Sequence, residues 1–260
     1  MDKRNSPIII CGAARSGTTF IWQLLNEHPD IVLSDEFFIY KTPSMMKWFD
    51  EMREAFGSLT ARGDWKPRKA AIMRSLWYYT SQPARAEAGL ISRRWGNKTP
   101  GSELYIDFYE DVFEQWPPQY IYCMRNPKNV FLSVRNMAWG KRVHIRGQVK
   151  RYIESVRAME AFKKRVPERM LIFQVDRVAS ELESRVSVVR EILDYVGEEL
   201  ADEMTPFIQS WRKVLSTERV RRKEPENILS SLPEKDIQYL KNHAGILRIA
   251  HAYGYSDLNV

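Results

Sequence analysis

Near the N-terminus, a short apolar run leads through a glycine turn directly into a helical pattern. Residues 7–11 (PIIIC) are apolar and rich in β-branched side chains, which is typical of a strand buried on both faces of a parallel sheet. Residues 18–28 carry apolar side chains at helical spacing, and Pro29 ends that helix. Residues 31–33 read as the next strand. This order predicts a βαβ unit, and with it a parallel sheet.

The rest of the chain continues the alternation of strands and helices. We expect strands at 92–97, 119–124 and 169–175, and helices at 103–116, 127–139, 146–166, 183–196 and 233–253. No repeat, low-complexity segment or linker interrupts the pattern. The sequence therefore predicts an α/β fold: a single three-layer, P-loop-like domain over 1–260, whose central, mostly parallel sheet is flanked by helices. The helical, aromatic-rich stretch 43–91 is interpreted as an insertion that covers a cleft.

Composition narrows the classes of partner. Lys and Arg outnumber Asp and Glu by 40 to 33, which favours anionic ligands. No basic run is interleaved with aromatic residues, so a nucleic-acid surface is not expected. Cys11 and Cys123 lie in apolar strands, which excludes a disulfide framework and a zinc site. No run of about 18 apolar residues is present. We expect a cytoplasmic protein without an integral membrane segment.

The turn after the first strand has the spacing of a phosphate-binding loop. Residues 12–19 (GAARSGTT) follow G-x-x-x-x-G-T-T, close to the triphosphate loop G-x-x-x-x-G-K-[ST]. Gly17 and its neighbours allow backbone N–H groups to point at an anion, and the following helix N-terminus adds positive charge. Ser16, Thr18 and Thr19 add hydroxyl donors. Thr18 occupies the lysine position, and the cation stands earlier, at Arg15, so the loop suits two anionic groups in line.

The stretch PIIICGAARSGTTFIWQLLNEHPDI resembles the 5′-phosphosulfate loop of sulfotransferases that use 3′-phosphoadenosine 5′-phosphosulfate (PAPS). Its sequence motif is most similar to that of the tyrosylprotein and carbohydrate branch of that family. The resemblance implies PAPS as co-substrate and adenosine 3′,5′-bisphosphate (PAP) as product, with no metal. It also implies a loop in which Arg15, Ser16, Gly17, Thr18 and Thr19 bind the phosphosulfate.

A second strand, turn and helix at 120–136 is similar to the family's R-[DN]-P-x-x-x-x-x-S segment, which binds the nucleotide 3′-phosphate. The resemblance assigns that phosphate to Arg125 and Ser133. The segment LSTERV (215–220) resembles a later nucleotide contact, with Ser216 as donor. The chain departs from the family at Val175, where a Tyr is common, and it lacks the glycine-rich R-K-G-x-x-G segment.

Sulfuryl transfer needs a base for the acceptor proton and a cation near the bridging oxygen. By resemblance to the tyrosylprotein branch, Glu36 is the candidate base, and Lys98 in GNKTP (96–100) is the candidate cation. Asp35 remains an alternative base. His144 is a further alternative, because cytosolic sulfotransferases use a histidine.

The resulting prediction is a sulfotransferase that moves a sulfuryl group from PAPS to an acceptor hydroxyl by in-line displacement. The acceptor is expected to be a small natural product, a sugar or a lipid-linked saccharide, and a tyrosine remains possible. The oligomeric state is not predicted. Two alternatives stay open: a P-loop nucleotide kinase, which would need a lysine at position 18, and a non-catalytic anion-binding module.

Overall fold

The fold is built on one parallel β-sheet. The computed structural model describes residues 5–36, 42–48, 50–51, 66–80, 94–177, 182–215 and 231–255. Within these ranges the strands form a five-stranded sheet in the order β2-β3-β1-β4-β5, and every pairing is parallel. The strands are β1 (Ile8–Cys11), β2 (Ile31–Asp35), β3 (Arg94–Lys98), β4 (Gln119–Met124) and β5 (Met170–Gln174). The α/β fold with a central parallel sheet is confirmed.

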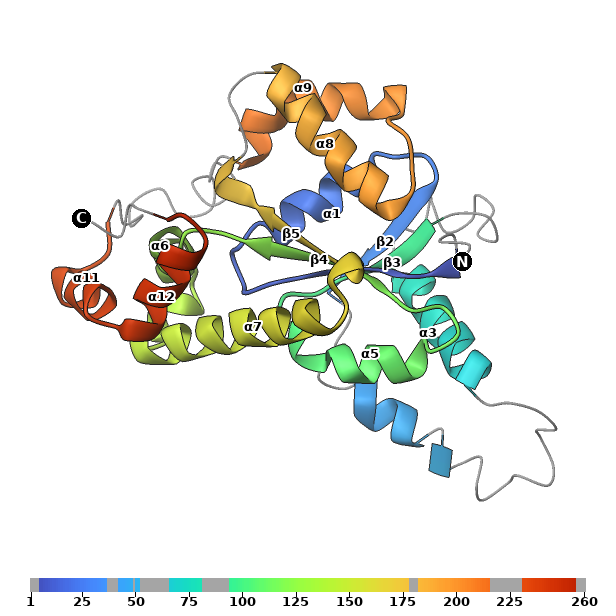
Figure 1. The fold of residues 1–260 in the computed structure, drawn as a ribbon, viewed down its shortest axis with the longest axis horizontal. Coiled ribbons are helices and arrows are strands. Elements are labelled where there is room, and N and C mark those ends of the chain that lie inside the picture. Colours follow the sequence, from blue (N-terminus) through green and yellow to red (C-terminus); the bar gives the residue numbers. More distant parts are fainter. Residues whose placement is uncertain are drawn as a thin grey trace.

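Helices cover both faces of the sheet (Figure 1). One face carries α1 (Thr18–Asn26), α8 (Leu182–Val196) and α9 (Thr205–Leu215), and the other carries α3 (Lys66–Thr80), α5 (Ile106–Val112) and α7 (Ile145–Arg165). Three further helices, α6 (Pro127–Arg135), α11 (Glu234–Lys241) and α12 (Ala244–Ala252), gather beside the end of α7 at the carboxyl end of the sheet. No helix in the described ranges combines the length and the apolar composition needed to cross a bilayer.

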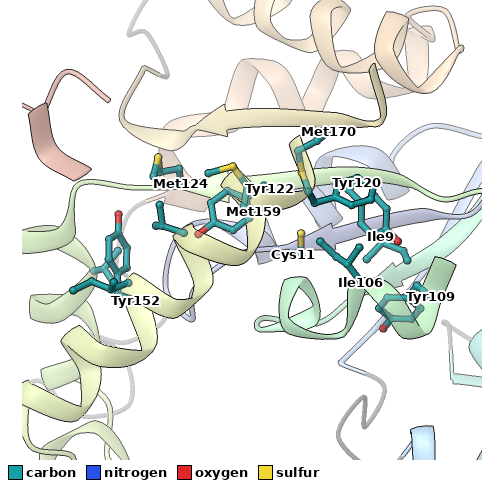
Figure 2. Packing of buried hydrophobic residues seen from close by; sticks show 14 of the residues in the cluster. Ile9, Cys11, Ile106, Tyr109, Tyr120, Tyr122, Met124, Tyr152, Met159 and Met170 are labelled. Carbon is teal, nitrogen blue, oxygen red and sulfur yellow. The ribbon is translucent and has the colours of Figure 1, made fainter. Parts of the chain in front are cut away.

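The alternating faces of each strand divide the core into two clusters. On β1, Ile8 and Ile10 pack with α1, α8 and α9, whereas Ile9 and Cys11 pack with α5 and α7. Figure 2 shows the second cluster, in which Tyr152 and Met159 of α7 lie under the sheet. A strand buried on both faces needs a continuous apolar run, and that is the pattern of residues 8–11.

Helix α3, which lies in the stretch 43–91, packs against the core. Trp77 of α3 is buried, and its ring lies 5.7 Å from that of Trp95 on β3 and 5.5 Å from that of Phe113. Helix α3 therefore forms part of the outer layer over β2 and β3. The role of the remaining stretch as a cover falls largely outside the described residues.

Two predicted helices have other bounds in the structure, and one helix of the structure was not predicted. The predicted helix 103–116 is a 3-10 turn (Ser102–Tyr105) followed by α5, because the backbone leaves helical angles at Tyr105, whose φ is −120° and ψ is 20°. The predicted helix 233–253 is divided into α11 and α12 at residues 242–243. Helix α9 was not predicted at all, although Ile208 on it is buried against the sheet cluster.

Candidate functional site

The site lies at the carboxyl ends of the strands, where open parallel sheets bind their ligands. The loop after β1 needs glycine at its start. A Cβ on Gly12, whose φ is 131°, would lie 2.3 Å from the carbonyl oxygen of Cys123 on β4. A Cβ on Gly17, with φ 96°, would lie 2.7 Å from Cγ2 of Val175, so Val175, which departs from the family's pattern, closes against this glycine. The loop is therefore held against β4 and the residue after β5.

The loop presents donors and positive charge. The Ser16 hydroxyl is buried and has no hydrogen-bond partner among the described residues. Helix α1 begins at Thr18 with Gly17 at its N-cap and no side-chain cap, so the amides of its first turn have no capping side chain. A buried hydroxyl beside an uncapped helix N-terminus is an arrangement that an anionic oxygen stabilises.

Arg15 connects the two predicted phosphate segments. Its backbone has a left-handed φ of 72°, and its Nε donates a hydrogen bond of 3.0 Å to the hydroxyl of Ser133 on α6. Burial and then the charge of Arg125 lower the pKa of the Arg15 guanidinium, while Glu36 opposes that shift. Arg15, Arg125 and Ser133 thus converge on one place, although the motifs that carry them are far apart in the sequence.

Asp176 holds the turn after β4. Its carboxylate accepts hydrogen bonds from the Asn126 amide at 2.6 Å and from the Asn129 side chain at 3.3 Å, and it lies 3.8 Å from Nε of Arg125. The Arg125 carbonyl accepts a bond of 2.9 Å from the Tyr152 hydroxyl. Asp176 was not predicted as part of the site. It holds the residue that follows the arginine assigned to the 3′-phosphate and forms an ion pair with the side chain of that arginine.

Lys98 lies between the candidate base and the phosphate loop. The Lys98 ammonium is buried at the end of β3 and donates to Glu36 at 2.9 Å and to Thr19 at 3.5 Å. It also forms an ion pair with Asp35. The Glu36 amide in turn donates to the Lys98 carbonyl at 2.7 Å, and the Glu36 backbone has a left-handed φ of 48°. Because the strands β2 and β3 are neighbours, their ends bring this carboxylate and this ammonium together.

One aromatic contact and two side-chain hydrogen bonds hold the ends of β2 and β3 in place. The Lys98 ammonium lies 5.9 Å from the centre of the Trp22 ring on α1, a cation–π contact that was not predicted. The Asn97 side chain donates to the Ser34 hydroxyl at 2.7 Å, and the Thr99 hydroxyl donates to Asn97. Asn97 and Thr99 were expected to shape this turn; the Asn97 bond to Ser34 joins β2 to β3, and the Thr99 bond orients the Asn97 side chain.

The structure places the remaining predicted residues as follows. Thr18 is buried in the first turn of α1, and Ser216 lies outside the described residues. His144, the reserve base, is exposed and caps α7, where its Nδ1 accepts the Arg146 amide at 3.2 Å. Within the described ranges, no group of three or more His, Cys, Asp or Glu residues is arranged to hold a metal ion.

Three comparisons bear on this site. A family model described as the sulfotransferase family matches residues 7–202. A comparison with curated proteins found no match. The sulfotransferase domain of a Synechococcus olefin synthase is similar, with a TM-score of 0.55, 14% identity and 98% of each chain covered. The sulfotransferase domain from the curacin biosynthetic pathway has a TM-score of 0.56 at 14% identity, covering 96% of this chain and 97% of that one.

A mouse sulfotransferase complexed with PAP is similar at the same level. Its TM-score is 0.55 at 14% identity, and the alignment covers 97% of this chain and 90% of the mouse chain. At such identities the likeness to solved structures shows the fold, while the family model covers most of the chain.

Proposed function

Since this chain belongs to the sulfotransferase family, we propose that it transfers a sulfuryl group from PAPS to an acceptor hydroxyl and releases PAP. The observation that carries the proposal is the 3.0 Å hydrogen bond between Arg15 and Ser133. It joins the loop suited to a phosphosulfate with the segment suited to the 3′-phosphate. One bisphosphorylated nucleotide would then reach both sets of donors.

The residues of the site fit PAPS as a substrate. The buried Ser16 hydroxyl without a partner, the amides at the start of α1 and the Arg15 guanidinium are donors for the 5′-phosphosulfate. Arg125 and Ser133 are donors for the 3′-phosphate. Two arginines this close repel one another, and an anion between them removes that repulsion.

We assign proton transfer to Glu36 and stabilisation of the leaving group to Lys98. In the transfer, the acceptor oxygen forms a bond to sulfur while the bond from sulfur to the bridging oxygen breaks, and the acceptor proton goes to the Glu36 carboxylate. The Lys98 ammonium stabilises the charge that develops on the bridging oxygen of PAP. The pairing of Lys98 with Glu36 at 2.9 Å supports this division of roles, because both groups lie beside the phosphate loop through Thr19. Asp35, also paired with Lys98, is the alternative base.

A nucleotide panel tests the proposal. PAP should raise the melting temperature of the protein, whereas ATP with Mg²⁺ should leave it unchanged. With PAPS and an acceptor, the wild-type protein should release PAP. Stabilisation by ATP with Mg²⁺ and not by PAP would indicate a nucleotide kinase. Binding of PAP without turnover on any acceptor would indicate a non-catalytic binding module.

A further inference from the structure

A cavity of about 510 Å³ lies on the α7 side of the sheet, and residues next in sequence to Arg15 and close in sequence to Lys98 form part of its lining. This volume is within the range of small-molecule sites. Two of its walls come from the segments that carry the reactive groups: Ala13 and Ala14 precede Arg15, and Pro100 and Gly101 follow Lys98 by two and three residues. The Gly101 amide donates a hydrogen bond of 3.0 Å to the carbonyl of Gly12, which begins the phosphate loop. A molecule in this cavity therefore lies against both segments.

Glu103 lines this cavity and has no role in the transfer derived above. Its side chain is buried, and its Oε2 accepts the Gly12 amide at 2.8 Å. Its Oε1 is also buried but has no hydrogen-bond partner among the described residues. Burial raises the pKa of Glu103, while a hydrogen bond with the side chain of Ser155 and hydrogen bonds from backbone amides, that of Gly12 among them, oppose the rise. A buried carboxyl oxygen without a partner is stabilised by a ligand that brings a polar hydrogen.

Gln148 on α7 also lines this cavity and carries a second such oxygen. Its amide nitrogen donates to the Val143 carbonyl at 3.0 Å, which fixes the orientation of the side chain. Its Oε1 is buried and has no partner among the described residues. Two residues of the cavity lining thus each carry a buried oxygen acceptor without a partner among the described residues.

Apolar side chains make up most of the remaining wall and reach the surface at its mouth. Ala14, Pro100, Val130 and Val134 are part of the lining. Leu104 and Trp139 also line the cavity, yet they are 52% and 46% exposed. Large exposed apolar side chains at the edge of a cavity are typical of a surface that a ligand covers.

We propose that this cavity binds the acceptor, and that the acceptor is an uncharged, mainly apolar alcohol with one or two hydrogen-bond donors for the oxygens of Glu103 and Gln148. The inference rests on the proposed sulfuryl transfer and names the substrate class for it. The apolar body of the acceptor lies along the cavity wall and continues over Leu104 and Trp139.

The same lining disfavours the saccharide acceptors considered from the sequence. A sugar carries a hydroxyl on almost every carbon, and each hydroxyl buried against Pro100, Val130 or Val134 loses its bonds to water without gaining a partner. The charged residues of the lining are Glu103, Glu154 and Arg151, so an anionic acceptor would face two carboxyl groups and one guanidinium.

The test uses the full chain, PAPS and defined acceptors: 1-hexanol, 1-octanol, 1-decanol, 2-naphthol, glucose and N-acetylglucosamine. Release of PAP and formation of the sulfated product are measured for each. Turnover is expected with the apolar alcohols, with kcat/KM rising from hexanol to decanol, and not with the sugars. Sulfation of a sugar in preference to every apolar alcohol overturns the proposal.

A pair of matched variants locates the acceptor. Leu104→Asp and Leu247→Asp both replace a leucine that is exposed (52% and 42%), but of the two only Leu104 lines the cavity. Leu104→Asp should lower kcat/KM for decanol by about tenfold, the loss expected from removing one apolar side-chain contact. Leu247→Asp should leave it within about twofold, the scatter expected for a surface change. Equal values in the two variants place the acceptor elsewhere.

Gln148→Leu gives a second measure inside the cavity. It should raise KM for the alcohols and leave the Kd of PAP unchanged, because its loss removes an oxygen acceptor without touching the phosphate loop. An unchanged KM removes Gln148 from acceptor recognition. The outcomes separate the two proposals: no binding of PAP by the wild-type protein refutes the proposed function, while binding of PAP without sulfation of any apolar alcohol refutes the acceptor class.

Discussion

Replacing Arg15 should separate the stability of the site from its function. Arg15 has a left-handed backbone with φ 72°, which costs a residue other than glycine about 1–2 kcal/mol. Its guanidinium is also held near that of Arg125. Arg15→Gly removes both the strain and the charge, whereas Arg15→Met removes the charge and keeps the strain. A comparison of the two variants therefore cancels the lost charge and leaves the backbone strain together with the greater freedom of glycine in the unfolded chain.

Two opposing free-energy contributions set the expected difference in stability between the two variants. Relief of the left-handed conformation stabilises the folded glycine variant by about 1–2 kcal/mol, and the greater freedom of glycine in the unfolded chain offsets about 0.5–1 kcal/mol. Arg15→Gly should then be more stable than Arg15→Met by about 0.5–1 kcal/mol, or roughly 1–4 °C in Tm for a chain of this size. Both variants lose charge-assisted bonds of about 1.5–3 kcal/mol to the nucleotide, so the Kd of PAP should rise by about 10- to 150-fold.

Chemical denaturation and calorimetric titration with PAP measure the two effects. Arg157→Met serves as a control, since Arg157 is exposed on α7 and should leave the Kd of PAP unchanged. If Arg15→Gly is less stable than Arg15→Met, the backbone at Arg15 is not strained. If either variant binds PAP like the wild type, the loop does not hold the nucleotide through this side chain.

Three further predictions follow from other parts of the site. Lys98→Met and Glu36→Gln should each lower turnover by about 100-fold or more and leave the Kd of PAP within a few-fold; steady-state rates and titration check this, and full activity in either variant removes that residue from the mechanism. Gly12→Ala should unfold the protein or destabilise it by about 3 kcal/mol or more, because the new Cβ would lie 2.3 Å from the Cys123 carbonyl oxygen. Gly147→Ala on α7, with open space at its Cβ, should instead add up to about 1 kcal/mol, and a similar Tm in the two variants would contradict the close approach at Gly12. Asp176→Ala should lower the free energy of unfolding by about 1–3 kcal/mol, because the buried turn at Asn126 loses the acceptor of its amide; unchanged denaturation would show that Asp176 does not hold the turn.

The parts of the site that could be predicted are those that a short, continuous stretch of sequence determines. The loop at 12–19 could be recognised because an apolar strand, two glycines at fixed spacing and a helix follow one another directly. The strands were predicted within two residues of their ends, most directly where a strand is an uninterrupted apolar run buried on both faces, as in β1; β3, with the sequence RWGNK, contains no such run. The order of the strands in the sheet, with β1 between β3 and β4, could not be predicted, because no single segment of the sequence determines which strands pair.

Contacts between distant segments were beyond the reach of local patterns. Arg15 and Ser133 are 118 positions apart, and only the folded sheet brings the two strand ends together. Asp176 was missed because a lone carboxylate after a strand resembles a solvated turn. Glu103 was missed for a similar reason: an acidic residue at the start of a helical segment is expected to face water, and its burial depends on the closure of the loop above it.

Both phosphates of one nucleotide must fit this pair of adjacent strand ends. A crystal structure of the protein with PAP measures this directly. We predict the 5′-phosphate at the amides of residues 16–19 and the 3′-phosphate at Arg125 and Ser133, in one continuous molecule. Density for PAP that contacts just one of these two segments, or that lies elsewhere on the protein, would contradict the account.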